Sequence, residues 1–140
     1  MSNTNKNTIL TELINKQKTN IIATKKMNYK DMIRIIKNLD TSIFLENCCS
    51  IWNGYIVNDE EGKSSYINFY FKGKKISLHR LLYINYVGPL ADNEYVKFIC
   101  KNRGKCCNIN HMVLVNKEQN ELDKEDTKKR NRLNFSINFD

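Results

Sequence analysis

A group of thiol and imidazole side chains is the feature of this sequence best suited to chemistry. Cys100, Cys106 and His111 are separated by five and four intervening residues, in a segment rich in lysine and asparagine. Cysteines are often simply buried apolar groups, but three cysteines and a histidine within twelve residues of polar sequence indicate a metal site. A fourth ligand must come from elsewhere, and Cys48 and Cys49 are the cysteines outside this segment. Three thiolates and one imidazole predict a closed, tetrahedral, structural Zn²⁺ site.

The overall composition indicates one small intracellular domain. A chain of 140 residues is too short for two ordinary cores. It contains no apolar run long enough to cross a membrane, and its first ten residues lack the basic-then-apolar order of a secretory signal. We therefore expect an intracellular protein with no membrane partner, whose five cysteines stay reduced and favour metal binding over disulfides.

The positive charge is unevenly distributed along the chain. The formal net charge is +8: residues 1–37 carry +6 (eight Lys/Arg against two acids), residues 38–116 carry +2 (nine against seven) and residues 117–140 carry none (six against six). A basic segment beside a compact domain is typical of proteins that contact nucleic-acid phosphates. The same charge could serve solubility alone, and its distribution does not choose between the two roles.

Apolar periodicity predicts the elements around the candidate ligands. A helix is expected over residues 28–38, and a β-hairpin over 66–78 with its turn at Lys72-Gly73. A short helix is expected over 79–86, ended by Gly88-Pro89, and strands over 96–99 and 112–115. Asn116 and Gln119 form a capping-box pattern that begins another helix.

The predicted hairpin has two different faces, because side chains alternate along a strand. We expect Ile67, Phe69 and Phe71 to be buried. Tyr66, Asn68 and Tyr70 share the opposite face.

Several short motifs occur in a fixed order along the second half of the chain. They are Cys49-Ser-Ile-Trp52-Asn-Gly54, His79-Arg80-Leu-Leu-Tyr83, Val87-Gly88-Pro89-Leu90, Cys100-Lys-Asn-Arg, Cys106-Cys107-Asn108, His111 and Asn120. Together they resemble the zinc-binding-loop homing endonucleases, an HNH-like branch of the His-Me finger nucleases, over residues 48–120. The resemblance implies an α+β fold: a small zinc-stabilised His-Me finger (ββα) with an upstream β-hairpin and short helices.

The resemblance also implies which cysteines are ligands. The family's pattern selects Cys49 over Cys48 and Cys106 over Cys107, which completes the set with Cys100 and His111. The loop between the second and third of these ligands carries one residue more than the family usually has, near Gly104. Glycine can absorb such an insertion in a turn.

With this resemblance the domain organisation is as follows. We expect a basic flexible arm over residues 1–26, an amphipathic helix and linker over 27–47, the zinc-binding His-Me finger over 48–127, and a C-terminal tail over 128–140. Ile9, Leu10, Leu13 and Ile14 suit one face of a short helix within the arm, but nothing caps that helix well.

The catalytic positions implied by the resemblance are largely replaced. Active members use a histidine two residues before the first loop cysteine as general base, and that position is Phe98. The position of the phosphate-contacting arginine falls on or near Asn68, whereas Asn120 matches the asparagine that holds Mg²⁺. Phenylalanine cannot accept a proton. His79 is the other candidate base, but its place on an apolar helix face favours a structural role.

We therefore expect a nucleic-acid-binding protein derived from an HNH endonuclease and without hydrolytic activity. Resemblance and charge indicate contacts to DNA or RNA through the hairpin and the following helix, by Lys72, Lys74, Lys75, Tyr70 and Arg80. Lys128-Lys129-Arg130 could add phosphate contacts. One alternative is an active endonuclease that uses Mg²⁺. Another is a structural component of a large nucleoprotein or viral assembly. The sequence indicates no oligomeric state.

Overall fold

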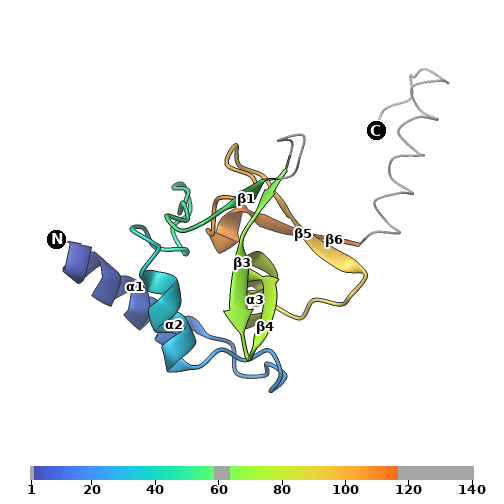
Figure 1. Cartoon of the computed structure of the whole chain (residues 1–140), viewed down its shortest axis with the longest axis horizontal. Coiled ribbons are helices and arrows are strands. Elements are labelled where there is room, and N and C mark those ends of the chain that lie inside the picture. Colours follow the sequence, from blue (N-terminus) through green and yellow to red (C-terminus); the bar gives the residue numbers. More distant parts are fainter. Residues whose placement is uncertain (1, 59–63, 117–140) are drawn as a thin grey trace.

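The chain folds into short helices and small antiparallel sheets packed around one core. The computed structural model describes residues 2–58 and 64–116. Within them lie α1 (Ser2–Lys16), α2 (Tyr29–Ile36), β1 (Val57–Asn58), β2 (Ser65–Tyr66), β3 (Asn68–Phe71), β4 (Lys74–Ser77), α3 (Leu78–Tyr86), β5 (Glu94–Phe98), the 3₁₀ turn η1 (Ile109–His111) and β6 (Met112–Asn116). The strands pair as β1–β2, β3–β4 and β5–β6 (Figure 1). The predicted α+β class is confirmed.

The β3–β4 hairpin and α3 form the centre of the molecule, and the hairpin lies over the helix (Figure 1). Ile67, Phe69 and Phe71 are buried as expected, whereas Tyr70 is 61% exposed. Lys72 and Gly73 make the turn with φ angles of 50° and 79°, as a two-residue hairpin turn requires. α3 begins directly after β4, since the Ser77 side chain accepts a hydrogen bond from the Arg80 amide.

The described part of the N-terminal segment is not a flexible arm, which corrects the prediction for residues 1–26. Residues 2–16 form α1, and Ile9 and Leu13 are buried in the core that also contains Met32 and Ile35 of α2. These two α1 residues are four positions apart, so they lie on one helix face and pack against α2. Burial of this face supplies the stability that the poorly capped sequence lacks.

The side chain of Asn85 in α3 holds the linker between α1 and α2 in place through hydrogen bonds. Its side-chain oxygen accepts hydrogen bonds from Gln17 Nε2 (2.8 Å) and the Met27 amide (3.0 Å), and its Nδ2 donates to the Lys25 carbonyl (2.9 Å). The Tyr86 hydroxyl donates to the Leu13 carbonyl at 2.9 Å. Asn85 is fully buried, and these bonds satisfy its amide.

α2 begins at a capping box made by two side chains. Asn28 Oδ1 accepts a hydrogen bond from the Asp31 amide (2.9 Å), and Asp31 Oδ2 accepts one from the Asn28 amide (3.0 Å). The helix predicted over residues 28–38 is thus confirmed, with a shorter extent of Tyr29–Ile36.

The β5–β6 hairpin follows α3 and frames the candidate ligands. β5 begins two residues earlier than predicted and ends at Phe98, which pairs with Met112. The helix expected after Asn116 lies outside the described residues, as does the tail at 128–140. In the described part of the chain, no helix is long and apolar enough to span a membrane.

The burial of α1 can be tested with two adjacent residues. Leu13 is fully buried, whereas Ile14 is 46% exposed. Leu13→Ala should lower the free energy of unfolding by about 2–5 kcal/mol. Ile14→Ala should lower it by about 1 kcal/mol or less. Denaturant unfolding checks this, and equal small effects of both substitutions would restore the flexible-arm prediction.

Candidate metal centre

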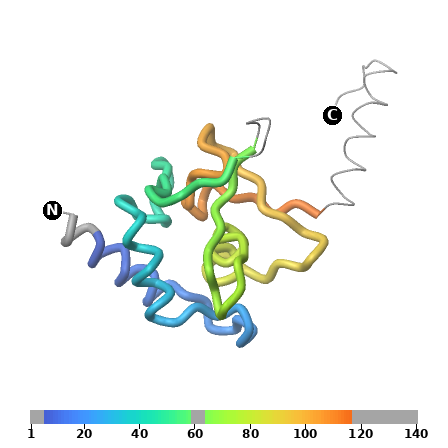
Figure 2. Tube along the Cα trace, viewed as in Figure 1, coloured from blue at the N-terminus to red at the C-terminus, as the bar shows by residue number. Residues whose placement is uncertain are grey.

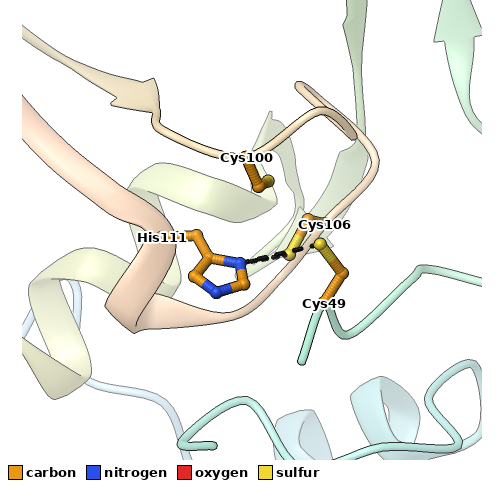
Figure 3. Close-up of side chains that lie close together, drawn as sticks. All are labelled: Cys49, Cys100, Cys106 and His111. Carbon is orange, nitrogen blue, oxygen red and sulfur yellow. Dashed lines mark hydrogen bonds between the residues drawn. The ribbon is translucent and has the colours of Figure 1, made fainter. Parts of the chain in front are cut away.

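The four predicted ligands meet at one point although they come from three segments. Cys49 precedes β1, Cys100 and Cys106 bound the loop after β5, and His111 ends η1 (Figure 3). The loop is joined to the first segment by a β-bridge between Ile51 and Cys106. The three sulfur atoms and the histidine nitrogen all lie within 4.8 Å of one another. This Cys₃His cluster could bind a metal ion.

The spacing of the donor atoms suits a tetrahedral site. Metal–sulfur and metal–nitrogen bonds of about 2.3 and 2.0 Å in a tetrahedron separate a sulfur from a nitrogen ligand by about 3.5 Å. His111 Nδ1 lies 3.7 Å from Cys49 Sγ and 3.5 Å from Cys106 Sγ. No pair is more than 4.8 Å apart, so closing the tetrahedron requires shifts of only about 1 Å.

The histidine is held in the tautomer that a metal ligand needs. His111 Nε2 lies 3.3 Å from the backbone carbonyl of Glu46, and because a carbonyl can only accept, Nε2 is the donor. The unprotonated Nδ1 therefore points toward the sulfur atoms. A backbone carbonyl behind the second ring nitrogen is a frequent feature of histidines that bind metals.

Burial and backbone amides act in opposite directions on Cys106. Burial raises the pKa of the Cys106 thiol to about 12. The amides of Asn108 and Ser50 donate to its sulfur, each at 3.4 Å, and oppose that rise. A bound cation would deprotonate the thiol, and the two amides are already placed to support the resulting thiolate.

The cluster receives further support from two asparagines. A hydrogen bond from the Asn102 side chain is the main cause that lowers the pKa of Cys49. Asn108 is fully buried, and its Nδ2 donates to the carbonyls of Leu45 and Cys48. Asn108 thereby fastens the segment that carries Cys49 to the loop that carries the other ligands. The sequence analysis predicted neither role. For Asn108 a signal was present, since an asparagine directly before a 3₁₀ turn is a common side-chain cap.

Cys48 and Cys107 lie outside the cluster. Cys48 is exposed, whereas Cys107 is fully buried and its amide donates to the Ser50 carbonyl at 2.7 Å. Burial raises the pKa of the Cys107 thiol. The structure thus brings together the cysteines that the resemblance selected.

Comparison with known proteins agrees with this architecture. Residues 77–122, which contain α3, the loop from Cys100 to Cys106 and β6, match the family model described as HNH endonuclease. This segment belongs to an HNH-like family. The chain is also 55% identical over 111 residues to an uncharacterized protein of Acanthamoeba polyphaga mimivirus, a match that covers 79% of this chain and 32% of that relative. The chain therefore spans about one third of the relative's length. No solved structure matches it significantly.

Phe98, the predicted general-base position, makes an aromatic contact. The Phe98 and His79 rings meet edge to face, with centroids 4.7 Å apart and planes at 76°. His79 is buried and its Nε2 donates to the Cys106 carbonyl at 2.9 Å. Burial lowers the pKa of His79 to about 4. The chain has two histidines, and His79 and His111 are thus both engaged in structural contacts.

The other predicted site residues of the HNH-like segment and its hairpin are spread more widely. Asn68 pairs with Ser77 in the β3–β4 hairpin, and Asn120 lies outside the described residues. Arg80 donates to the carbonyls of Glu94 (2.6 Å) and Ala91 (3.0 Å), so it fastens the turn before β5.

The predicted nucleic-acid contacts of the hairpin lie at and beside its turn. Lys72, Lys74, Lys75 and Tyr70 are all exposed. Lys72 Nζ also donates to the Ala23 carbonyl. The hairpin thus presents these cations and a tyrosine to solvent, whereas the guanidinium of Arg80 is committed to the fold.

Adjacent cysteines provide a matched test of the cluster. Cys49→Ser removes one of the four donors and should abolish tight metal binding, because three ligands leave the site open. Cys48→Ser changes the neighbouring, exposed thiol and should retain one metal ion per chain. Metal content after dialysis, measured by elemental analysis, checks both. Equal retention or equal loss would show that Cys49 is not a specific ligand.

Gly104 allows a second test, of the loop that bears the ligands. It has φ +78°, and a Cβ there would overlap the backbone carbonyl of Ser65. Gly73 has φ +79° but open space around it. Gly73→Ala should therefore cost only the conformational strain, about 1–2 kcal/mol. Gly104→Ala should cost more and weaken metal retention. Unfolding and metal-content measurements check this, and equal effects would contradict the packing of the loop on β2.

Proposed function

We propose that this chain is a nucleic-acid-binding protein derived from an HNH endonuclease, in which hydrolysis has been lost and the Cys₃His cluster holds a structural Zn²⁺. The observation that carries the proposal is the contact between Phe98 and His79. The predicted general-base position is a residue without a proton acceptor, and the histidine beside it is buried. General-base catalysis contributes about 10²–10⁴-fold to such reactions.

Zinc is supported by the kind and number of the donors. Three thiolates with one imidazole suit Zn²⁺, and four protein ligands leave no open position for a water or a substrate. The role of such an ion is to hold the Cys49 segment, the loop and η1 together. Elemental analysis of the purified chain identifies the metal, and it separates zinc from other thiophilic ions.

Nucleic-acid binding is supported by the family and by the charge. Residues 77–122 are HNH-like, and the exposed hairpin carries Lys74 and Lys75 beside Tyr70. A two-stranded ribbon fits the major groove of DNA, and cations beside it contact phosphates. An intracellular location stays a prediction.

A specific observation favours the alternative of an active endonuclease. The family match extends to residue 122 and so includes Asn120, the position that would hold Mg²⁺. The third alternative, a component of a large assembly, gains no support from residues 2–58 and 64–116 and stays a prediction.

Plasmid nicking separates the first two functions. The wild-type chain should leave supercoiled plasmid intact in Mg²⁺ or Mn²⁺, because no proton acceptor is available at Phe98. Phe98→His, alone and combined with Asn68→Arg, should introduce nicking, whereas Phe98→Leu should not. Nicking by the wild-type chain that disappears in Asn120→Ala would overturn the proposal, since it would identify a working Mg²⁺ site.

A further inference from the structure

The loop between Cys100 and Cys106 presents a regular row of exposed cations. Lys101, Arg103 and Lys105 alternate along it, and all three are exposed. The sequence from residue 95 to residue 116 contains four Lys/Arg and neither aspartate nor glutamate. Among the residues that the structure describes, no ion pair involves these three cations. We call residues 100–106 the metal loop.

The backbone of the metal loop is fixed at several points. The Asn102 carbonyl accepts hydrogen bonds from the amides of Lys105 (3.0 Å) and Cys106 (2.9 Å), and the Lys105 carbonyl accepts one from the Trp52 amide (2.9 Å). Gly104 packs against the backbone of Ser65. The two ends of the loop are the ligands Cys100 and Cys106. The cations therefore project from a constrained backbone, which lowers the entropy lost when they bind a partner.

The metal loop is far from the lysines of the β3–β4 hairpin. Figures 1 and 2 show the hairpin turn at one end of the molecule and the metal loop near the opposite end, beside β1 and β2. The two sets of cations therefore form separate surfaces. A contact made by the loop would be additional to the contacts expected from the hairpin.

The negative charge of a metal-bound cluster is smaller than the positive charge of these three cations. Three thiolates (−3) and one divalent ion (+2) leave the cluster at −1, since the imidazole is neutral. The three exposed cations (+3) then leave the metal loop at +2. A compact surface with this excess and no acidic partner within the loop suits a polyanion.

We propose that the metal loop is a second nucleic-acid contact, in which Lys101, Arg103 and Lys105 bind the phosphodiester backbone. This inference rests on the proposed function. Phosphates are the shared chemistry of DNA and RNA, and arginine and lysine are the side chains best suited to contact them. Because the ligands constrain the loop, the metal site also sets the geometry of this surface.

The test compares three triple substitutions of equal charge. Each variant replaces three cations by glutamine and so lowers the formal net charge from +8 to +5: K101Q/R103Q/K105Q in the metal loop, K72Q/K74Q/K75Q in the hairpin, and K26Q/K30Q/K37Q as control. The control residues are exposed and lie before or on α2 or directly after it. They belong to the basic segment 1–37, so this variant also measures what that segment contributes to binding. Affinities for a DNA duplex, a DNA single strand and an RNA duplex are measured by fluorescence anisotropy between 50 and 200 mM salt.

The metal-loop variant should bind at least about tenfold more weakly than the control at the higher salt concentrations. On duplex DNA its plot of log K against log salt should be shallower by about 1 for each phosphate that the variant no longer neutralises. If the variant keeps its metal content and its unfolding midpoint, its lower affinity comes from the lost cations and not from a loss of metal or of folding. The polymer whose affinity falls most identifies the source of the phosphates.

Two results would overturn the inference while leaving the proposed function intact. In one, the wild-type chain binds, the hairpin variant binds more weakly, and the metal-loop variant behaves as the control does. In the other, the metal-loop variant loses its metal, which would assign the cations to balancing the thiolates. Absence of any binding by the wild-type chain would instead overturn the proposed function, and the inference with it.

Discussion

The thiols of Cys49, Cys100 and Cys106 and the imidazole of His111 approach one another from three separate segments. Hydrogen bonds also join these segments: the two backbone bonds of the Ile51–Cys106 bridge, the bond from the Ile109 amide to the Ile43 carbonyl, and the side-chain bonds that Asn108 and Asn110 donate to the segment before Cys49. In a chain this small, buried apolar surface supplies little surplus stability. Cross-linking by a metal is a physical solution to that shortage, and the orientation of every donor in the cluster is consistent with it.

α3 connects this cluster to the rest of the fold. At one end, His79 donates to the Cys106 carbonyl and so contacts the backbone of a ligand. At the other end, Asn85 and Tyr86 hold the segment that includes α1 and the linker before α2. One nine-residue helix thereby joins the two halves of the molecule. A change in its position would be felt both at the metal loop and at the N-terminal helices.

The same helix carries His79, whose contact with Phe98 underlies the proposed loss of hydrolysis. His79 is held by a backbone carbonyl and its ring meets Phe98, so the space beside the end of β5 is filled by two rings. A water molecule that attacks phosphorus needs both a neighbouring proton acceptor and room to approach. Phe98 has no atom that accepts a proton, and burial of His79 lowers the pKa of its imidazole, which weakens it as a base. The exposed cations at the hairpin turn and on the metal loop do not depend on this arrangement.

The sequence alone predicted that cysteine and histidine side chains are the metal ligands, because these residues so close together in polar surroundings strongly favour a metal site. The buried face of the β3–β4 hairpin was equally legible, since alternation places Ile67, Phe69 and Phe71 on one side of a strand. These are local properties, carried by residue type and spacing. The choice of Cys49 over its neighbour depended on resemblance, because spacing alone left two thiols.

Only the tertiary structure decided the features that join distant segments. The sequence of α1 has weak caps and few apolar residues, and its helix is explained by burial of Ile9 and Leu13 against α2 rather than by local preference. Asn85 and Asn108 are ordinary surface residues by type, yet both are fully buried because backbone groups far along the chain complete their hydrogen bonds. The sequence predicts that Arg80 contacts phosphate, but its guanidinium donates hydrogen bonds to two backbone carbonyls near β5. Such partners lie 11 to 68 positions away, so no pattern of neighbouring residues could reveal them.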